Sequence, residues 1–211
     1  MKLVKSLLAT AVAASTVALS VPAMSYEAGD MMVKAGVIHV APKSDNLELD
    51  GVGTVEVKSD TQLGLTFTYM VTPQVGVEVL AATPFKHQIE LDGEKVGTTK
   101  HLPPTVSAQY YPMDSSSAIQ PYVGAGLNMT LFFEEEDIAS GDDGVGPLTD
   151  SFGLSVSGGV NYNIDDKLMA NVAVWYIDID SKLDGAKDAG LPGDNVEIDP
   201  LVVMAGVGYK F

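Results

Sequence analysis

Few side chains in this sequence could do chemistry, and their spacing does not assemble a catalytic centre. The three histidines, His39, His87 and His101, lack the spacing of a zinc-binding HExxH motif. His87 and His101 flank one long connection, where they either pair or make ordinary hydrogen bonds. Serines and histidines occur without a recognisable pairing of nucleophile and base. We therefore expect a protein that is not an enzyme and has no catalytic residue, no metal site and no cofactor.

Two aspartates suggest calcium binding, but the residues around them do not complete a site. Asp178 and Asp180 precede the dipeptide Asp184-Gly185. An EF-hand loop needs a third oxygen ligand at the position of Lys182, with glycine directly after it. A lysine ammonium cannot supply that oxygen, so the calcium interpretation fails.

The N-terminal residues 1–25 have the pattern of a secretory signal peptide. Two early lysines give a positive start, an apolar run covers residues 7–21, and Ala23-Met24-Ser25 supplies small residues for cleavage. We expect the cut before Tyr26. A cut two residues earlier and an uncleaved membrane anchor are the alternatives.

The remaining chain, residues 26–211, is strongly acidic. The formal charge of the sequence is −16 and becomes −18 when Lys2 and Lys5 leave with the signal peptide. This charge, together with the absence of arginine, excludes nucleic acid as a partner, because phosphates repel an acidic surface. No cysteine is present, which excludes disulfides and thiolate metal sites. The length is typical of one domain.

Apolar residues recur at every second position in eight segments, which predicts β-strands with one apolar face. In the clearest segment, residues 61–70, leucine and aromatic residues alternate with glycine, glutamine and threonine. No segment after the signal peptide reaches the ~18 apolar residues that a spanning helix needs. The eight segments are residues 31–40, 61–70, 75–82, 102–111, 121–133, 152–164, 168–179 and 201–211.

Short and long connections alternate between these segments. Such a layout, with an even number of strands, is that of a bacterial outer-membrane barrel with long loops outside and short turns in the periplasm. A soluble lipocalin-like barrel would place the apolar face inside instead. We predict an all-β fold, an eight-stranded antiparallel transmembrane β-barrel in the cell outer membrane. The short connections are residues 72–74, 112–117 and 165–166, and the long ones are 42–60, 84–100, 134–149 and 181–195.

The last strand carries an apolar face to the end of the printed sequence. Tyr209 and Phe211 place aromatic side chains in phase with that face. Aromatic strand ends lie at membrane interfaces, and every strand edge must pair in lipid. We therefore expect Tyr209 and Phe211 to anchor the strand that closes the barrel, and the barrel-assembly machinery to engage this strand.

Taken together, several stretches along residues 26–211 resemble the OmpW family of small bacterial outer-membrane proteins. The resemblance implies an eight-stranded barrel with a narrow hydrophobic interior that helps small apolar compounds cross the outer membrane. The matching stretches are Tyr26–Gly29, Thr61–Met70, Gly76–Phe85, His101–Pro104, Pro121–Gly126, Val174–Asp180 and Gly208–Phe211.

Independently of that resemblance, the alternation places three charges in the interior near the periplasmic end. Lys34, Glu78 and Lys210 all fall on the inward positions of their strands. A charge inside a narrow barrel needs a partner, since burying it alone is costly. We expect these three residues to form an ion-paired plug.

Farther toward the outside, the inward positions become apolar. Leu80, Met70, Trp175 and Ile177 belong to this set, with Leu80 and Trp175 as its floor. These side chains either line a pocket for a small hydrophobic ligand or simply fill a small barrel.

Four prolines lie where strands approach the long loops: Pro84, Pro103, Pro104 and Pro200. Each removes a donor from the strand ladder. Either the strands end at these positions, or the wall has a local gap through which an apolar ligand leaves sideways into lipid.

The sequence thus predicts an outer-membrane barrel that passes or binds small apolar molecules, with lateral release as a further hypothesis. The alternative is a structural or adhesive barrel that acts through its acidic outer loops. The expected partners are outer-membrane lipids, lipopolysaccharide and a small hydrophobic ligand. The acidic loop residues either meet divalent cations held by these lipids or are plain solvated surface.

Overall fold

The computed structural model describes residues 25–43, 47–49, 53–91, 93–136, 149–182 and 195–211. The expected signal peptide lies, except for Ser25, outside the described residues. In the part of the chain that is described, no helix is long and apolar enough to span a membrane.

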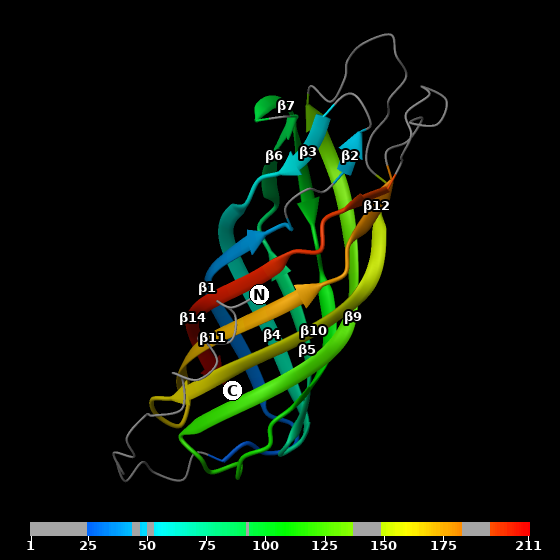
Figure 1. Cartoon of the computed structure of the whole chain (residues 1–211). Coiled ribbons are helices and arrows are strands. Elements are labelled where there is room, and N and C mark those ends of the chain that lie inside the picture. Colours follow the sequence, from blue (N-terminus) through cyan, green and yellow to red (C-terminus); the bar gives the residue numbers. More distant parts are fainter. Residues whose placement is uncertain (1–24, 44–46, 50–52, 92, 137–148, 183–194) are drawn as a thin grey trace, which may run out of the picture.

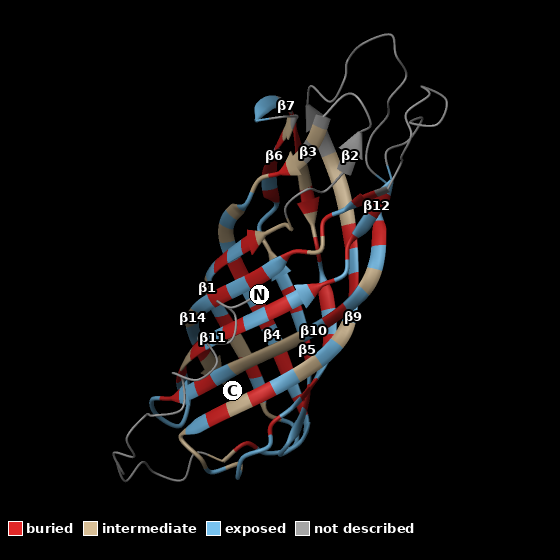
Figure 2. Ribbon diagram, viewed as in Figure 1, coloured by how far each residue is buried: buried red, intermediate tan, exposed pale blue. Residues whose placement is uncertain are grey.

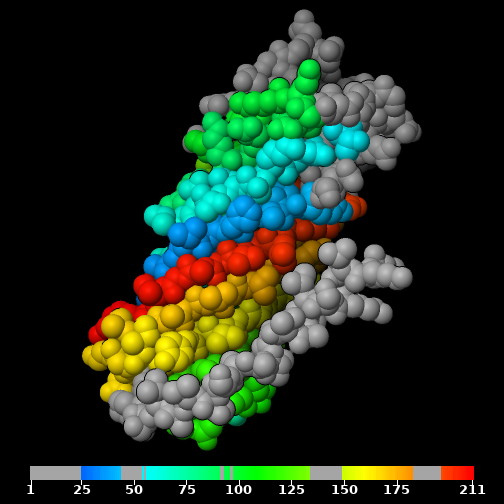
Figure 3. Space-filling view, turned by 60° about the vertical axis from the view of Figure 1, so that its left-hand side comes forward, coloured from blue at the N-terminus to red at the C-terminus, as the bar shows by residue number. Residues whose placement is uncertain are grey.

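Eight strands form a closed antiparallel wall, as the alternation predicted. Neighbouring strands pair in the order β1-β4-β5-β8-β9-β10-β11-β14, and β14 pairs with β1 to close the barrel. The strands cross the outer surface as oblique neighbouring bands (Figures 1 and 3). Their bounds are β1 Met31–Ala41, β4 Asp60–Thr72, β5 Val75–Ala82, β8 Thr105–Tyr110, β9 Ile119–Glu136, β10 Ser151–Asn163, β11 Leu168–Ile177 and β14 Leu201–Lys210.

Buried and exposed residues alternate along every strand of the wall (Figure 2). The exposed set is apolar, which is the arrangement for a wall surrounded by lipid. The interior set is rich in threonine, serine, asparagine and glycine, so the predicted inside and outside faces are confirmed. Apolar residues on the outward positions of the strands are exposed, among them Leu65, Phe67, Val106, Leu127, Val156 and Val172.

The C-terminal residues close the barrel. Tyr209 pairs with Val33 in the β14–β1 ladder. The backbone nitrogen of Phe211 continues the ladder by donating to the Met31 carbonyl at 2.8 Å. The Tyr209 and Phe211 rings lie edge to face, with centroids 4.9 Å apart. The last residue is therefore tied into the wall, at the end of the barrel that carries the short turns.

At the opposite end, part of the wall extends beyond the barrel as smaller strands (Figure 1). The expected long loop at residues 84–100 is instead a β-hairpin of β6, Phe85–Leu91, and β7, Glu94–Leu102. Its turn contains Gly93 at φ 85°, a left-handed conformation that glycine adopts without steric cost. Two further strands extend this hairpin: β3, Gly53–Val57, pairs with β6, and β2, Leu47–Leu49, pairs with β3. A separate pair consists of β12, Asp180–Lys182, and β13, Asn195–Glu197.

The lipid-facing assignment can be tested with a charge at mid-wall. Arginine in place of Leu65 should cost about 2–4 kcal/mol of folding free energy in a bilayer, because a charge near the midplane is poorly solvated. Urea titration of folding into vesicles measures this cost. The control is Gln88→Arg at an outward position on the β6 extension, which should change the folding free energy little. Equal costs at the two positions would contradict the placement of the membrane.

Candidate functional site

The lower interior is held by one fully buried ion pair. The Lys34 Nζ and Glu78 Oε2 atoms lie 2.7 Å apart, and both side chains are excluded from solvent. The two residues come from β1 and β5, which are separated by β4, and the Thr68 hydroxyl of β4 donates to the same carboxylate oxygen at 3.2 Å. The Lys34 ammonium also lies 5.1 Å from the centre of the Tyr122 ring. The Thr68 hydroxyl and the Tyr122 ring therefore support the pair, while the other carboxylate oxygen of Glu78 makes no hydrogen bond among the described residues.

The third expected member of the plug, Lys210, belongs to a separate contact. Its Nζ lies 3.3 Å from an Asp30 carboxylate oxygen and donates to the Ser25 carbonyl at 2.7 Å. Its side chain is 17% exposed, so it lies at the rim of the barrel. The prediction of a three-charge plug is wrong in this respect. Alternation places Lys210 on the correct face, but it cannot reveal a partner in the segment before the first strand.

Aromatic and amide side chains, which the sequence analysis did not single out, seal the barrel around the ion pair. The ring centroids of Tyr111 and Tyr26 are 5.4 Å apart, and those of Tyr111 and Tyr122 are 5.2 Å apart. Asn161 donates to the Tyr26 hydroxyl at 3.0 Å, and Asn171 donates to Asn161 at 2.7 Å. Most of these residues occupy inward positions of the alternating strands and could have been predicted from the sequence. Tyr26 could not, because it precedes β1 and belongs to no strand.

The upper interior is apolar on the side formed by β1, β5, β11 and β14, where it contains a narrow crevice with a cavity volume of about 10 Å³, roughly the room of one water molecule. Buried polar side chains of β8, β9 and β10, among them Thr105, Asn128 and Ser155, line the rest of the interior at this height. Leu80 and Ile177 line the crevice. Trp175 is buried and pairs across the ladder with Val202, which also lines it. The remaining lining residues are Ile38, Val40, Ala81, Ala82, Phe85 and Pro103.

Met70 does not join this apolar group, which corrects the sequence prediction. It pairs with Gly76 beside the short β4–β5 turn, two residues beyond the Thr68–Glu78 pair. It therefore lies on the periplasmic side of the ion pair. Alternation gave its inward direction correctly, but the height of a residue depends on the direction in which its strand runs.

The wall is interrupted beside the crevice. Pairing between β5 and β8 ends at Leu80 and Thr105, and the next pair across this seam joins Phe85 to His101. Continued register would place Pro103 opposite Ala82, and proline has no N–H to donate. Ala81 faces outward and yet lines the crevice together with interior residues. The crevice therefore runs from the barrel interior into the broken seam.

A stacked histidine pair lies above the crevice in the β6–β7 hairpin. The His87 and His101 rings are 4.7 Å apart and nearly parallel, and both are buried. The Nδ1 atom of His87 is hydrogen-bonded to the Lys58 carbonyl. Burial lowers the pKa of His87 and lowers the pKa of His101 to about 3. Both rings are therefore neutral at pH 7. This agrees with the expectation that the two histidines could pair.

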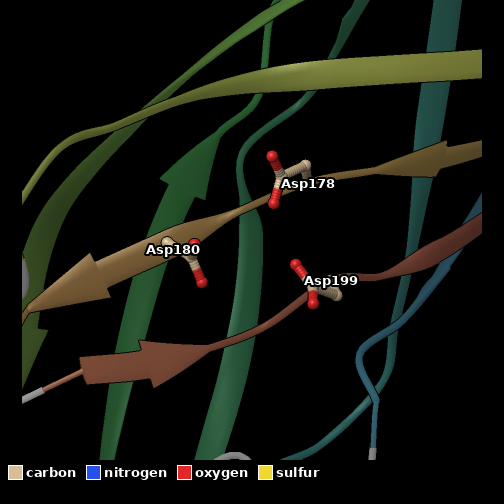
Figure 4. Close-up of side chains that lie close together, drawn as sticks. All are labelled: Asp178, Asp180 and Asp199. Atoms are coloured by element: carbon tan, nitrogen blue, oxygen red, sulfur yellow. The ribbon is translucent and has the colours of Figure 1, made fainter.

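Three aspartates meet above the wall (Figure 4). Carboxylate oxygens of Asp178, Asp180 and Asp199 all lie within 4.8 Å of one another. Burial and the neighbouring carboxylates raise the pKa of Asp180. Asp199 was not predicted from the sequence. Its carboxylate lies 3.6 Å from the Lys43 Nζ atom and accepts a hydrogen bond from the Ile179 backbone nitrogen at 3.1 Å. Such oxygen atoms suit a hard cation, but exposed acidic groups are also common without one.

Comparison with known proteins relates the whole barrel to one family. The sequence profile of the OmpW family matches residues 27–211. Outer membrane protein W of Escherichia coli is 43% identical over 97% of this chain and 99% of its own length. The protein of the same name from Vibrio cholerae is 41% identical over 91% and 93%. The crystal structure of OprG from Pseudomonas aeruginosa matches with a TM-score of 0.76 and 42% identity, over 90% of this chain and 99% of that one.

Removing one partner of the buried ion pair should destabilise the barrel. Glu78→Gln leaves the Lys34 ammonium without its counter-charge, so we expect a loss of about 3–5 kcal/mol in folding free energy. Urea-induced unfolding measures it. The double variant Lys34→Met/Glu78→Leu removes both charges and should regain most of the loss. A single variant as stable as the parent would show that the pair does not hold the lower interior together.

Acidification should loosen the β6–β7 hairpin. Above pH 6.5 both histidines are neutral whether the hairpin is closed or open. Below that pH the open form takes up protons that the closed form excludes, so the closed hairpin loses stability until about pH 3 for His101. At pH 5 the loss from His101 alone is about 2 kcal/mol. The negative charge of nearby Asp60 raises the pKa of both histidines and so reduces this loss of stability.

Amide hydrogen exchange in the hairpin, corrected for intrinsic rates, measures this opening. His101→Phe should remove most of the pH dependence, and His39→Phe, at an exposed position on β1, should leave it unchanged. Protection that stays constant between pH 7.5 and pH 5 in the parent protein would contradict the prediction.

Proposed function

Because the chain belongs to the OmpW family of non-enzymatic bacterial outer-membrane barrels, we propose that it binds small apolar molecules in its upper interior and releases them sideways into the membrane. The observation that carries this proposal is the crevice, which joins apolar interior residues to the broken seam between β5 and β8. The free energy of an apolar solute falls when it leaves water for the crevice or for lipid.

The lower interior supports the sideways direction. The Lys34–Glu78 pair and the tyrosine and asparagine side chains around it fill this region. An apolar molecule moving straight down the barrel would have to displace hydrogen-bonded groups and strip two charges of their partners, which is costly. Exit through the seam leaves the ion pair and the hydrogen-bonded groups around it in place.

The acidic outer end supports a second candidate function. The cluster of Asp178, Asp180 and Asp199 would let the barrel contact lipopolysaccharide through shared divalent cations or act as an adhesive surface. An adhesive barrel needs no apolar crevice, and its whole interior can be a polar network like that of the lower half here. The apolar crevice on one side of the upper interior therefore favours ligand passage as the main function.

Ligand binding in the upper interior should be visible through Trp175, which is the one tryptophan of the sequence. A brominated alkane should quench its fluorescence saturably, because the indole lies next to the crevice. Leu80→Ala removes lining contacts and should weaken binding about tenfold. Met70→Ala, a buried substitution below the ion pair, should leave the affinity unchanged. Quenching no greater than that of free tryptophan in the same detergent would remove the basis for the proposal.

Sideways release should depend on the broken seam. Pro103→Val restores an N–H opposite Ala82 and should let the β5–β8 ladder continue. We expect transfer of a fluorescent apolar probe into vesicle lipid to slow severalfold, while binding next to Trp175 persists. The control is Pro121→Val, within β9 and paired with Val160, which should not alter transfer. Unchanged transfer in Pro103→Val, with the restored hydrogen bond observed by NMR, would contradict lateral release.

A further inference from the structure

The histidine pair leaves several buried polar atoms without partners. Among the described residues, Nε2 of His87, both ring nitrogens of His101 and the Thr99 hydroxyl are buried and make no hydrogen bond. Thr99 pairs directly with His87 across the hairpin. Leaving such groups unpaired costs free energy, and native proteins rarely leave several together without a water molecule or a ligand group to bind them.

These atoms lie directly above the apolar crevice. Phe85 and Pro103 line the crevice, and His87 and His101 are the next inward residues on the same two segments. Two residues along a strand span about 6.6 Å. The Phe85 ring also contacts both imidazoles, with centroids 6.1 Å from His87 and 5.6 Å from His101. A molecule in the crevice that reached one step farther out would meet the histidines.

The pair offers complementary hydrogen-bonding groups. Since Nδ1 of His87 faces the Lys58 carbonyl, it carries the proton and donates, which leaves Nε2 as an acceptor. His101 is a neutral imidazole, so one of its free nitrogens is a donor and the other an acceptor. A hydroxyl group is both a donor and an acceptor. It can therefore donate to one ring and accept from the other.

We propose that His87 and His101, with Thr99, form a subsite that binds the hydroxyl group of an otherwise apolar ligand, so that a medium-chain alcohol is preferred to an alkane of equal length. This inference rests on the proposed function and specifies its substrate class. The depressed pKa values of both histidines keep the subsite uncharged at pH 7. The nearby Lys58 ammonium is held by Glu56 at 2.5 Å and Glu90 at 3.0 Å. A carboxylate would therefore be buried without a counter-charge, which disfavours fatty acids.

The test compares 1-octanol with n-octane as competitors of a brominated alkane that quenches Trp175. The measured quantity is the ratio of the two affinities in each variant. His101→Leu removes the hydrogen-bonding groups of one ring and should lower the alcohol-to-alkane ratio about three- to tenfold, the effect of one neutral hydrogen bond. His39→Leu, at the exposed histidine, should leave the ratio unchanged. In the parent protein, the imidazole ¹⁵N shifts of His101 should respond to octanol and not to octane.

An unchanged ratio in His101→Leu, or ¹⁵N shifts that ignore octanol, would show that the histidines only pack, and would overturn the subsite while leaving the crevice intact. Failure of both compounds to compete in the parent protein would overturn the proposed function and the subsite together. The ¹⁵N measurement needs no substitution, so the inference stays falsifiable even if His101→Leu does not fold.

Discussion

The structure depends on one constraint: in lipid, the wall must satisfy its own backbone hydrogen bonds. Eight strands meet this constraint by closing into a ring, and even Phe211 donates to Met31 at the seam between the last and first strands. The interruption between β5 and β8 is an exception to this closed pairing. Pro103 has no backbone N–H to donate where the β5–β8 ladder ends, and it also lines the interior crevice. The broken ladder and the apolar interior thus belong to one arrangement.

The second organising feature is the division of the interior. Below, a buried lysine and glutamate, with hydroxyl, amide and tyrosine groups around them, make a hydrogen-bonded seal. Above, leucine, isoleucine and valine side chains leave a crevice next to Trp175. In the proposed function, the polar seal below the apolar crevice directs an apolar molecule toward the wall. The polar seal also explains how an inward lysine is tolerated in a narrow barrel.

The alternation of apolar and polar residues was sufficient to predict the eight strands and the direction of each side chain. It predicted the Lys34–Glu78 partnership because both charges had to face inward on nearby strands. Alternation does not tell how far along the barrel axis a residue lies, because that depends on the direction of its strand. Met70 was therefore placed too far from the periplasmic end, although the short turn at Pro73 follows it closely. The hairpin at residues 84–100 was missed because the outward positions of β6, such as Lys86 and Gln88, are polar, although buried Phe85 and Ile89 keep the alternation of a strand. Contacts made by chain ends, such as Lys210 with Asp30, carry no periodic signal.

In the proposed function, apolar molecules pass through this barrel without an axial pore. Proteoliposomes that report ion conductance and apolar probe transfer at the same time test it most directly. We expect the probe to move from the outside into vesicle lipid while conductance stays near that of protein-free membranes. A wide, steady ion conductance, or delivery of the probe to the enclosed water before the lipid, would contradict it.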